Sequence, residues 1–141
     1  MTAARNLTTR RLSEVTLGEE LPALEIPLTA TVIIAGAIAS RDYQDVHHDP
    51  GLAQERGSKD IFMNILTTNG LVGRYITDWA GPDAVIRGLS VKLGTPNVPG
   101  DTMTFQGKVA ALTGDEAKIE VVGKNSWGNH VTGTVRVVLP R

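Results

Sequence analysis

The sequence predicts a single α+β domain in which one long helix lies against an antiparallel sheet. The chain has 141 residues, which is enough for one hydrophobic core and too few for two ordinary domains. Apolar residues recur at helical spacing over residues 61–79. From residue 85 onward apolar and polar residues alternate, as they do in strands with one buried face. These three observations define the fold class.

The helix predicted at residues 61–79 is the longest in the chain. Its apolar stripe consists of Phe62, Ile65, Leu66, Val72 and Ile76. Further apolar residues widen this stripe, so we expect the helix to be buried on more than one side. We expect Ser58 to cap its start, and Gly81 with Pro82 to end it.

Four strands are expected after this helix, at residues 85–94, 102–112, 117–127 and 130–139. The short turns between them argue for an antiparallel meander. Before the helix, we expect an extended segment up to Pro27 and then a short helix. The polar residues 1–20 are interpreted as an N-terminal arm, and residues 21–141 as the domain.

Composition excludes several classes of function. A net charge of −1 gives no basic surface for nucleic acid or anionic lipid. The absence of cysteine excludes disulfides, thiolate metal sites and cysteine nucleophiles, and it fits a reducing cytoplasm. No apolar run reaches the roughly 20 residues of a membrane span. We therefore expect a soluble, cytoplasmic protein with no nucleic-acid or membrane role.

The stretch RDYQDVHHDP, residues 41–50, holds two of the three histidines of the chain. Asp42 and His47 could converge on one water and exchange protons with it. A polar loop that starts a helical turn at Asp49 is an alternative. A metal site is a third, although the adjacent His47 and His48 lack the spacing that aims two imidazoles at one ion. These residues alone leave the three interpretations open.

A longer pattern resembles the MaoC-like (R)-specific enoyl-CoA hydratases. It consists of SRDYQDVHHDPGLA, KDIFMNIL and LGTPNVPGDTMTFQGKV, and the resemblance spans about residues 22–138. The positions of the family's hydratase motif are taken by Ser40, Asp42, Val46, His47 and Ala53. The Gly, Asn and Pro of that motif are replaced by Arg41, Gln44 and Asp45.

RDYQDVHHD, GSKDIFMNILT, RYITDWAGP and an ending with GKN and HVT are also similar to the small MaoC-like subunit of heteromeric hydratases that act on steroid side chains. The resemblance implies a hot-dog fold, a curved antiparallel sheet wrapped around one long central helix, with a fifth strand near residues 22–28. It also implies that hot-dog domains pair, with the acyl-CoA tunnel at their junction. The partner would be a larger MaoC-like subunit in a heterotetramer, with a homodimer as the alternative.

The implied reaction adds water across the double bond of a trans-2-enoyl-CoA to give a 3-hydroxyacyl-CoA. A steroid side-chain thioester would be the substrate, and no cofactor is needed because coenzyme A is part of the substrate. Asp42 and His47 would hold the attacking water. Where the family has His-Gly at the start of the long helix, this chain has Met63 and Asn64, so the backbone N–H of Asn64 is the candidate oxyanion donor. Asn69 is a weaker candidate for substrate binding.

Other interpretations remain for these residues and for the chain. Asn64 could be an ordinary polar residue of the first helical turn, and Asn69 could form an internal hydrogen bond to the sheet. His130 is expected to be exposed in a turn. The chain could instead be a hot-dog acyl-CoA thioesterase, or a non-catalytic subunit of a hydratase complex.

Overall fold

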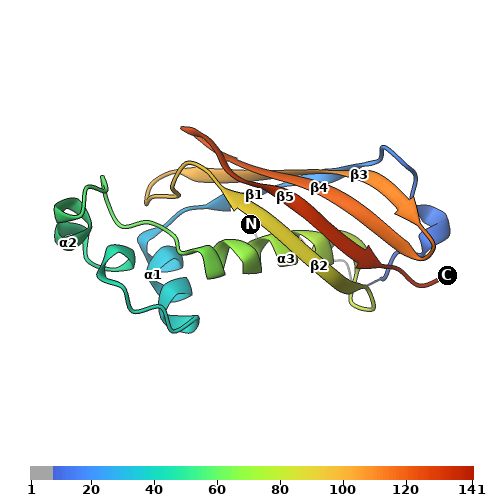
Figure 1. Ribbon diagram of the computed structural model, residues 1–141, viewed down its shortest axis with the longest axis horizontal. Coiled ribbons are helices and arrows are strands. Elements are labelled where there is room, and N and C mark those ends of the chain that lie inside the picture. Colours follow the sequence, from blue (N-terminus) through green and yellow to red (C-terminus); the bar gives the residue numbers. More distant parts are fainter. Residues whose placement is uncertain (1–7) are drawn as a thin grey trace.

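A five-stranded antiparallel sheet curves over the long helix α3 in the computed structural model, which describes residues 8–141 (Figure 1). The elements are η1 (Leu12–Glu14), β1 (Glu20–Pro27), α1 (Ala30–Ala39), η2 (Asp45–His47), α2 (Pro50–Glu55), α3 (Ile65–Ala80), β2 (Val85–Leu93), β3 (Thr102–Thr113), β4 (Glu116–Asn125) and β5 (Gly128–Val138). The predicted α+β class, with a hot-dog sheet around one helix, is confirmed. The extended segment before Pro27 and the short helix after it are both present.

The strand order is β1-β3-β4-β5-β2. Strands β3, β4 and β5 form the expected meander, but β2 pairs with β5 instead of β3, with Val91 opposite Gly133. The prediction of a meander through all four strands is therefore wrong for β2. Its connection to β3 contains Pro96 and Pro99, which have no N–H with which to close a tight hairpin. The chain instead crosses from the β2 edge of the sheet to β3, which lies between β1 and β4.

Helix α3 begins at Ile65, later than the sequence pattern suggests. Asn64 is its N-cap, because the side-chain oxygen of Asn64 accepts a hydrogen bond from the N–H of Thr67 at 3.0 Å. The expected cap at Ser58 is wrong, since the residues that follow it are not helical. The end is as predicted: Gly81 has φ of 95° and stops the helix.

The core lies between α3 and the concave face of the sheet. The ring of Tyr75 stacks on that of Phe105, with the centroids 5.1 Å apart. Burial raises the pKa of Tyr75 to about 12, so its hydroxyl stays protonated. The largest fully buried side chains include Leu28, Ile33, Ile61, Ile76, Met103, Phe105 and Ile119. The expectation that α3 is buried on more than one side is met by its buried residues Thr68, Val72, Tyr75, Ile76 and Trp79.

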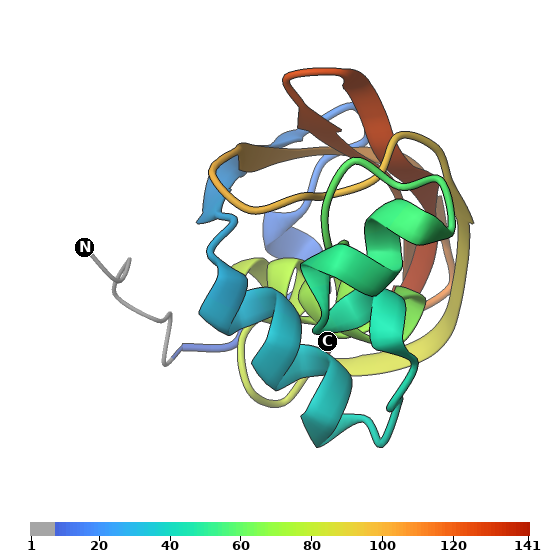
Figure 2. The ribbon, with the colours of Figure 1, turned by 90° about the vertical axis from the view of Figure 1, so that its left-hand side faces the viewer.

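The two ends of the molecule differ. At one end, two backbone hydrogen bonds of 2.8 Å tie the segment before β1 to the domain. The N–H of Arg10 donates to the carbonyl of Ala80, and the N–H of Leu12 donates to the carbonyl of Pro140. The remainder of the predicted N-terminal arm, residues 1–7, lies outside the described residues. At the other end, α1 and α2 gather beside the start of α3 (Figure 2). Within residues 8–141, no helix is long and apolar enough to cross a membrane.

The packing of α3 predicts a large cost for Ile76→Ala. The side chain of Ile76 is fully buried, so its truncation should lower the free energy of unfolding by about 3 kcal/mol. The exposed neighbour Thr77 is the control, because Thr77→Ala should change it by less than about 0.5 kcal/mol. Urea denaturation measures both values, and equal effects would contradict this packing.

Candidate active site

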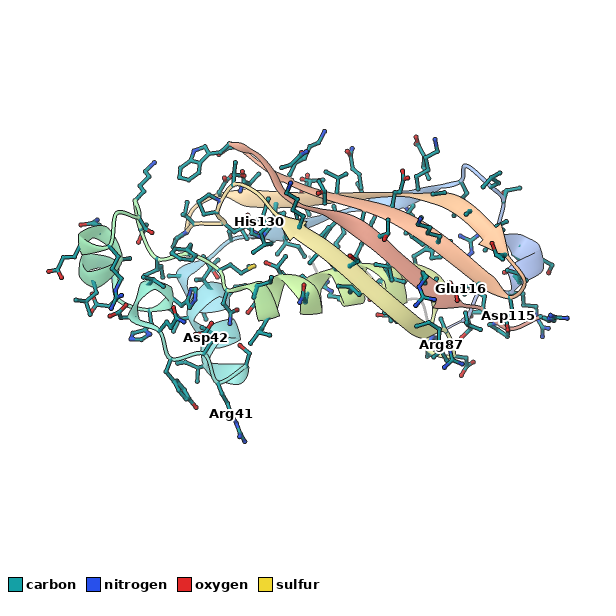
Figure 3. All side chains as sticks on the ribbon, in the orientation of Figure 1. Arg41, Asp42, Arg87, Asp115, Glu116 and His130 are labelled. Carbon is teal, nitrogen blue, oxygen red and sulfur yellow. The ribbon has the colours of Figure 1, made fainter. Side chains whose placement is uncertain are left out.

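The turn after α1 directs Asp42 toward the start of α3. Arg41 has φ of 58°, the only positive φ of a non-glycine residue within residues 8–141. Such a conformation costs roughly 1–2 kcal/mol for a residue with a side chain. The N–H of Asp42 then donates to the carbonyl of Ala37 at 2.9 Å, which closes the turn. The side chain of Arg41 extends away from the sheet (Figure 3).

Asp42 and His47 are brought together by this turn and by the short helix η2. The distance between Asp42 Oδ2 and His47 Nε2 is 3.3 Å. The His47 side chain is 6% exposed and that of Asp42 is 20% exposed, so the imidazole is enclosed while the carboxylate reaches the surface. The pairing expected from their spacing in the sequence is present in the structure.

A backbone carbonyl sets the orientation of the His47 ring. Nδ1 of His47 lies 2.7 Å from the carbonyl oxygen of Phe62. A carbonyl oxygen only accepts hydrogen bonds, so Nδ1 carries the proton in the neutral ring. The lone pair of neutral His47 is therefore on Nε2, the nitrogen that faces Asp42. The Phe62 ring packs edge-on against the imidazole, with the centroids 4.9 Å apart.

Asn64 is the buried centre of a hydrogen-bond network around Asp42. Its Nδ2 lies 3.1 Å from Asp42 Oδ2 and 2.9 Å from Ser40 Oγ. The hydrogen bond from Asn64 holds the pKa of Asp42 below its usual range, and the backbone N–H of Gln44 and the neighbouring His47 add to this effect. Asp42 is thus a carboxylate at neutral pH.

The sequence predicted that the backbone N–H of Asn64 is an oxyanion donor. No described residue accepts a hydrogen bond from this N–H. Sequence reasoning gave no role to Thr67 or to the carbonyl of Phe62. A sequence signal for the Asn64–Thr67 contact exists, because Asn is a preferred N-cap and its oxygen bonds the N–H three residues later. No sequence signal marks a backbone carbonyl as the partner of a histidine.

The other ionisable residues of the stretch 41–50 do not join the pair. His48 is exposed. Asp49 caps α2 by accepting a hydrogen bond from the N–H of Leu52 at 3.0 Å, which is the helical turn expected there. Asp45, for which the sequence suggested no role, forms an ion pair with Arg56 at 3.0 Å. Of the three aspartates and two histidines in this stretch, only Asp42 and His47 therefore converge.

Asn69 lies in the middle of α3. No hydrogen bond joins it to Asp42 or His47, and its buried Oδ1 has no hydrogen-bond partner among residues 8–141. The expected internal hydrogen bond to the sheet is therefore wrong. A buried carbonyl oxygen without a partner in the chain is a candidate for an external donor.

His130 is buried, contrary to the prediction of an exposed turn residue. The residue is 2% exposed, because β5 begins at Gly128 and His130 faces inward from this strand. Nδ1 of His130 lies 2.7 Å from the carbonyl oxygen of Thr95, and Nε2 lies 2.8 Å from Thr68 Oγ1. Burial lowers its pKa, so the ring is neutral and joins β5 to α3.

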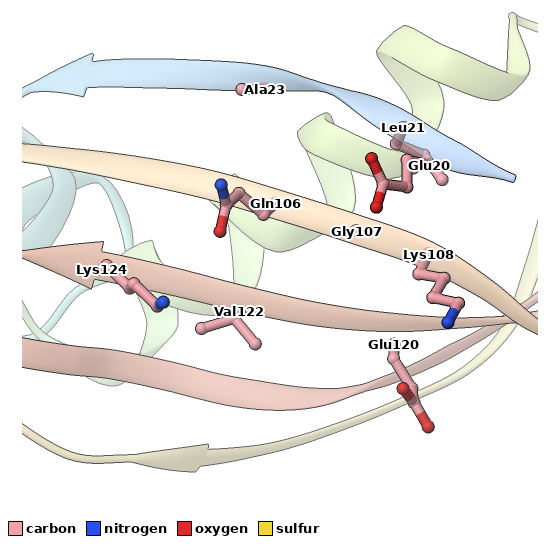
Figure 4. A pocket seen from close by; sticks show the side chains of 9 residues that line it. All are labelled: Glu20, Leu21, Ala23, Gln106, Gly107, Lys108, Glu120, Val122 and Lys124. Atoms are coloured by element: carbon pink, nitrogen blue, oxygen red, sulfur yellow. The ribbon is translucent and has the colours of Figure 1, made fainter. Parts of the chain in front are cut away.

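Two depressions differ in their relation to the Asp42–His47 pair. One of about 430 Å³ lies on the outer face of the sheet and is lined by charged residues such as Lys108 and Glu120 (Figure 4). The other, of about 320 Å³, lies between α1 and α3 and includes Ser40, Thr67 and the apolar Leu66. This groove borders the Asn64 network through Ser40 and Thr67, and neither Asp42 nor His47 lines it. Within residues 8–141, no three His, Cys, Asp or Glu side chains are grouped to hold a metal.

A carboxylate and an imidazole lone pair that face one point can bind a single water and exchange protons with it. The fold and this pair define a hot-dog domain with a carboxylate–imidazole pair at the start of its central helix. The chain is 50% identical, over 121 residues, to the 3-oxo-4,17-pregnadiene-20-carboxyl-CoA hydratase beta subunit of Mycobacterium tuberculosis, covering 86% of this chain and 94% of the relative. The chain belongs to the MaoC-like hydratase family.

Solved structures agree with this assignment. The ChsH1–ChsH2 complex from Mycobacterium tuberculosis contains a chain that is 48% identical, with a TM-score of 0.87 and coverage of 88% of this chain and 98% of that one. The unliganded R-hydratase PhaJ1 from Pseudomonas aeruginosa is 19% identical, with a TM-score of 0.84 and coverage of 92% and 84%, and shows the fold alone. No protein-family model matches the chain.

The contact between α1 and the Asn64 network predicts opposite effects for two glycine substitutions. A Cβ at Gly36 would lie 2.3 Å from Thr67 Oγ1, whereas one at Gly70 would have no atom within 4 Å. Both glycines are inside helices, so alanine improves helix propensity equally. We expect Gly36→Ala to lower the free energy of unfolding by about 1–3 kcal/mol. Gly70→Ala should raise it by about 0.5–1 kcal/mol.

Chemical denaturation of the two variants measures this difference. A stabilising Gly36→Ala would contradict the close contact between α1 and Thr67. A destabilising Gly70→Ala would show that its surroundings are less open than the structure indicates.

Proposed function

We propose that this chain is the catalytic subunit of an enoyl-CoA hydratase that acts on a steroid side-chain thioester. The reaction is the addition of water to a trans-2-enoyl-CoA to give a 3-hydroxyacyl-CoA. The observation that carries the proposal is the 3.3 Å approach of Asp42 Oδ2 and His47 Nε2, with Nδ1 of His47 engaged by a carbonyl. The 50% identical relative is named as a hydratase subunit with such a substrate.

The pair accounts for activation of water. A water held between the two side chains can donate one hydrogen bond to His47 Nε2 and one to Asp42. Because Asn64 lowers the pKa of Asp42, this carboxylate is a weak base. We therefore assign proton acceptance to His47, whose Nε2 carries the lone pair that faces this water. The ionised Asp42 then stabilises the imidazolium that forms beside it.

The steps balance without an added cofactor. The water oxygen bonds to Cβ, its proton passes to Nε2 of His47, and the electron pair of the double bond moves toward the thioester oxygen. The proton then passes from Nε2 to Cα as the thioester carbonyl is restored. We accordingly propose that the enzyme uses no cofactor besides the coenzyme A of its substrate.

The developing oxyanion needs a donor, and we assign the backbone N–H of Asn64 to this role. Among residues 8–141, no acceptor engages this N–H. It lies at the N-terminal end of α3, a helix of 16 residues whose dipole favours negative charge there. Asn69, with its unpartnered Oδ1, remains a weaker candidate for contact with the acyl group.

A second hot-dog subunit is part of the proposal. Ile65 and Leu66, in the first turn of α3, are 47% and 49% exposed beside the groove, and Ile38 of α1 is 53% exposed. These apolar side chains need a cover, which a bound acyl group and a partner subunit would supply. The ChsH1–ChsH2 complex supports assembly with a larger MaoC-like subunit. We place the enzyme in the cytoplasm, where CoA thioesters are made and consumed.

Substitution of either member of the pair tests the function. Asp42→Asn keeps the shape of the side chain and removes its negative charge, and His47→Gln replaces the imidazole with an amide that is not basic. Each should lower kcat/KM by about 10²-fold or more, since acid–base groups contribute that much. The assay follows the loss of enoyl absorbance with crotonyl-CoA and with a steroid enoyl-CoA, with and without a co-expressed MaoC-like partner.

His48→Gln is the matched control, because His48 is an exposed neighbour and its substitution should leave the rate unchanged. Wild-type rates for Asp42→Asn and His47→Gln would instead indicate a non-catalytic subunit. Release of free CoA from acyl-CoA, without hydration, would indicate a thioesterase.

A further inference from the structure

We propose that the side chain of Asn64 is a positioning residue that holds the Asp42 carboxylate in its working orientation opposite His47. This role is distinct from that of the Asn64 backbone N–H, and it rests on the proposed hydratase function. The side chain belongs to the start of α3, while Asp42 follows α1, so the contact joins two elements that are distant in the sequence.

Neighbouring groups determine which end of the Asn64 amide faces Asp42. The backbone N–H of Thr67 can only donate, and it lies 3.0 Å from Oδ1 of Asn64. The hydroxyl of Thr67 donates to the same oxygen at 2.5 Å. Oδ1 is therefore the end near Thr67, and the NH₂ group is the end directed at Asp42. A flipped amide would set an NH₂ group against a backbone N–H.

The second hydrogen of the amide is also committed. The hydroxyl of Ser40 donates to the carbonyl oxygen of Gly36 at 2.7 Å, which leaves its oxygen free to accept from Asn64 Nδ2 at 2.9 Å. Both hydrogens of Nδ2 are thus used, one on Ser40 and one on Asp42. Asn64 itself is 2% exposed, so water cannot readily replace either bond.

These contacts hold a carboxylate whose other hydrogen-bond donor among the described residues is the N–H of Gln44, at 3.4 Å from Oδ1. Asp42 follows the strained turn at Arg41, and one fifth of its side-chain surface is exposed. The same oxygen, Oδ2, receives Asn64 at 3.1 Å and faces His47 Nε2 at 3.3 Å. Without the amide, the carboxylate could rotate toward solvent or away from the water position. A displacement of this kind lowers the rate more than it lowers substrate binding.

The ionisation of Asp42 provides a second readout. The hydrogen bond from Asn64 is the main reason for the lowered pKa of Asp42. Its removal should raise this pKa, so protonation of the carboxylate would begin at higher pH. The helix-capping function of Asn64 has no such consequence, which allows the two roles to be separated.

Two substitutions preserve the cap and change the contact with Asp42. Asn64→Asp is close to isosteric, keeps an oxygen for Thr67, and replaces the donor to Asp42 with a second carboxylate. Asn64→Ser also caps well but is too short to reach Asp42. Both retain the backbone N–H. Thr29→Ala is the control for loss of a cap alone, because Thr29 caps α1 by accepting from Val32 and has no contact with the pair.

The experiment uses the full chain in complex with its partner subunit. Asn64→Ser should raise the pKa of the Asp42 carboxyl, and Asn64→Asp should raise it further. At neutral pH, kcat should fall about tenfold with little change in KM. The ¹³C shift of the Asp42 carboxyl, followed through the acid range in labelled protein, should show the same rise in pKa. Thr29→Ala should lower the melting temperature and leave the Asp42 titration unchanged.

Unchanged titration of Asp42 in both Asn64 variants would overturn the positioning role. So would a loss of activity that follows the melting temperature alone. The carboxyl titration does not depend on turnover. If the wild-type protein is inactive and the Asn64 variants shift the Asp42 titration, the hydratase function is refuted and the contact is supported. If the wild-type protein is active and the variants leave the Asp42 titration unshifted, the hydratase function stands and the positioning role is refuted.

Discussion

The burial of one helix by a curved sheet is the constraint on which the other features depend. Five strands cover most of α3, and its buried residues fill the concave face of the sheet. The first turn of α3 extends beyond this cover, as the exposure of Ile65 and Leu66 shows. Its unpaired N–H groups and positive dipole end therefore lie where α1 and η2 approach. The candidate active site occupies the place where the core ends and the helix terminus needs partners.

The contacts at this terminus serve structure and chemistry together. Asn64 satisfies an N–H of the first turn, accepts from Thr67, and donates to Ser40 and Asp42. A residue required for the helix start is thus attached to the charged pair. Local stability and the placement of the charge are coupled, so a change in the α1–α3 contact at Gly36 reaches Asp42 through Thr67 and Asn64.

Periodicity was sufficient to predict α3 and the four strands after it, because each element buries one face and exposes another. It misplaced the start of α3, since the apolar residues Ile61 and Phe62 fit a helical stripe although their backbone is not helical. The position of β2 depends on closure of the sheet, which local pattern does not encode. Asp42 and His47 were predictable from residue types and resemblance. The contact of the Asn64 side chain with Asp42 and the inward position of His130 were not, because tertiary packing alone determines them.

The hydrogen bond between His47 Nδ1 and the carbonyl of Phe62 has a consequence for variation of the site. The acceptor is main chain, so it is present whatever side chain stands at position 62, provided that the backbone keeps its path. The ring of Phe62, in contrast, is a side-chain wall beside the imidazole. Mutations at this position can therefore reshape the packing around the imidazole while the tautomer of the histidine stays the same. The packing of the imidazole and its tautomer are therefore separable at a single residue.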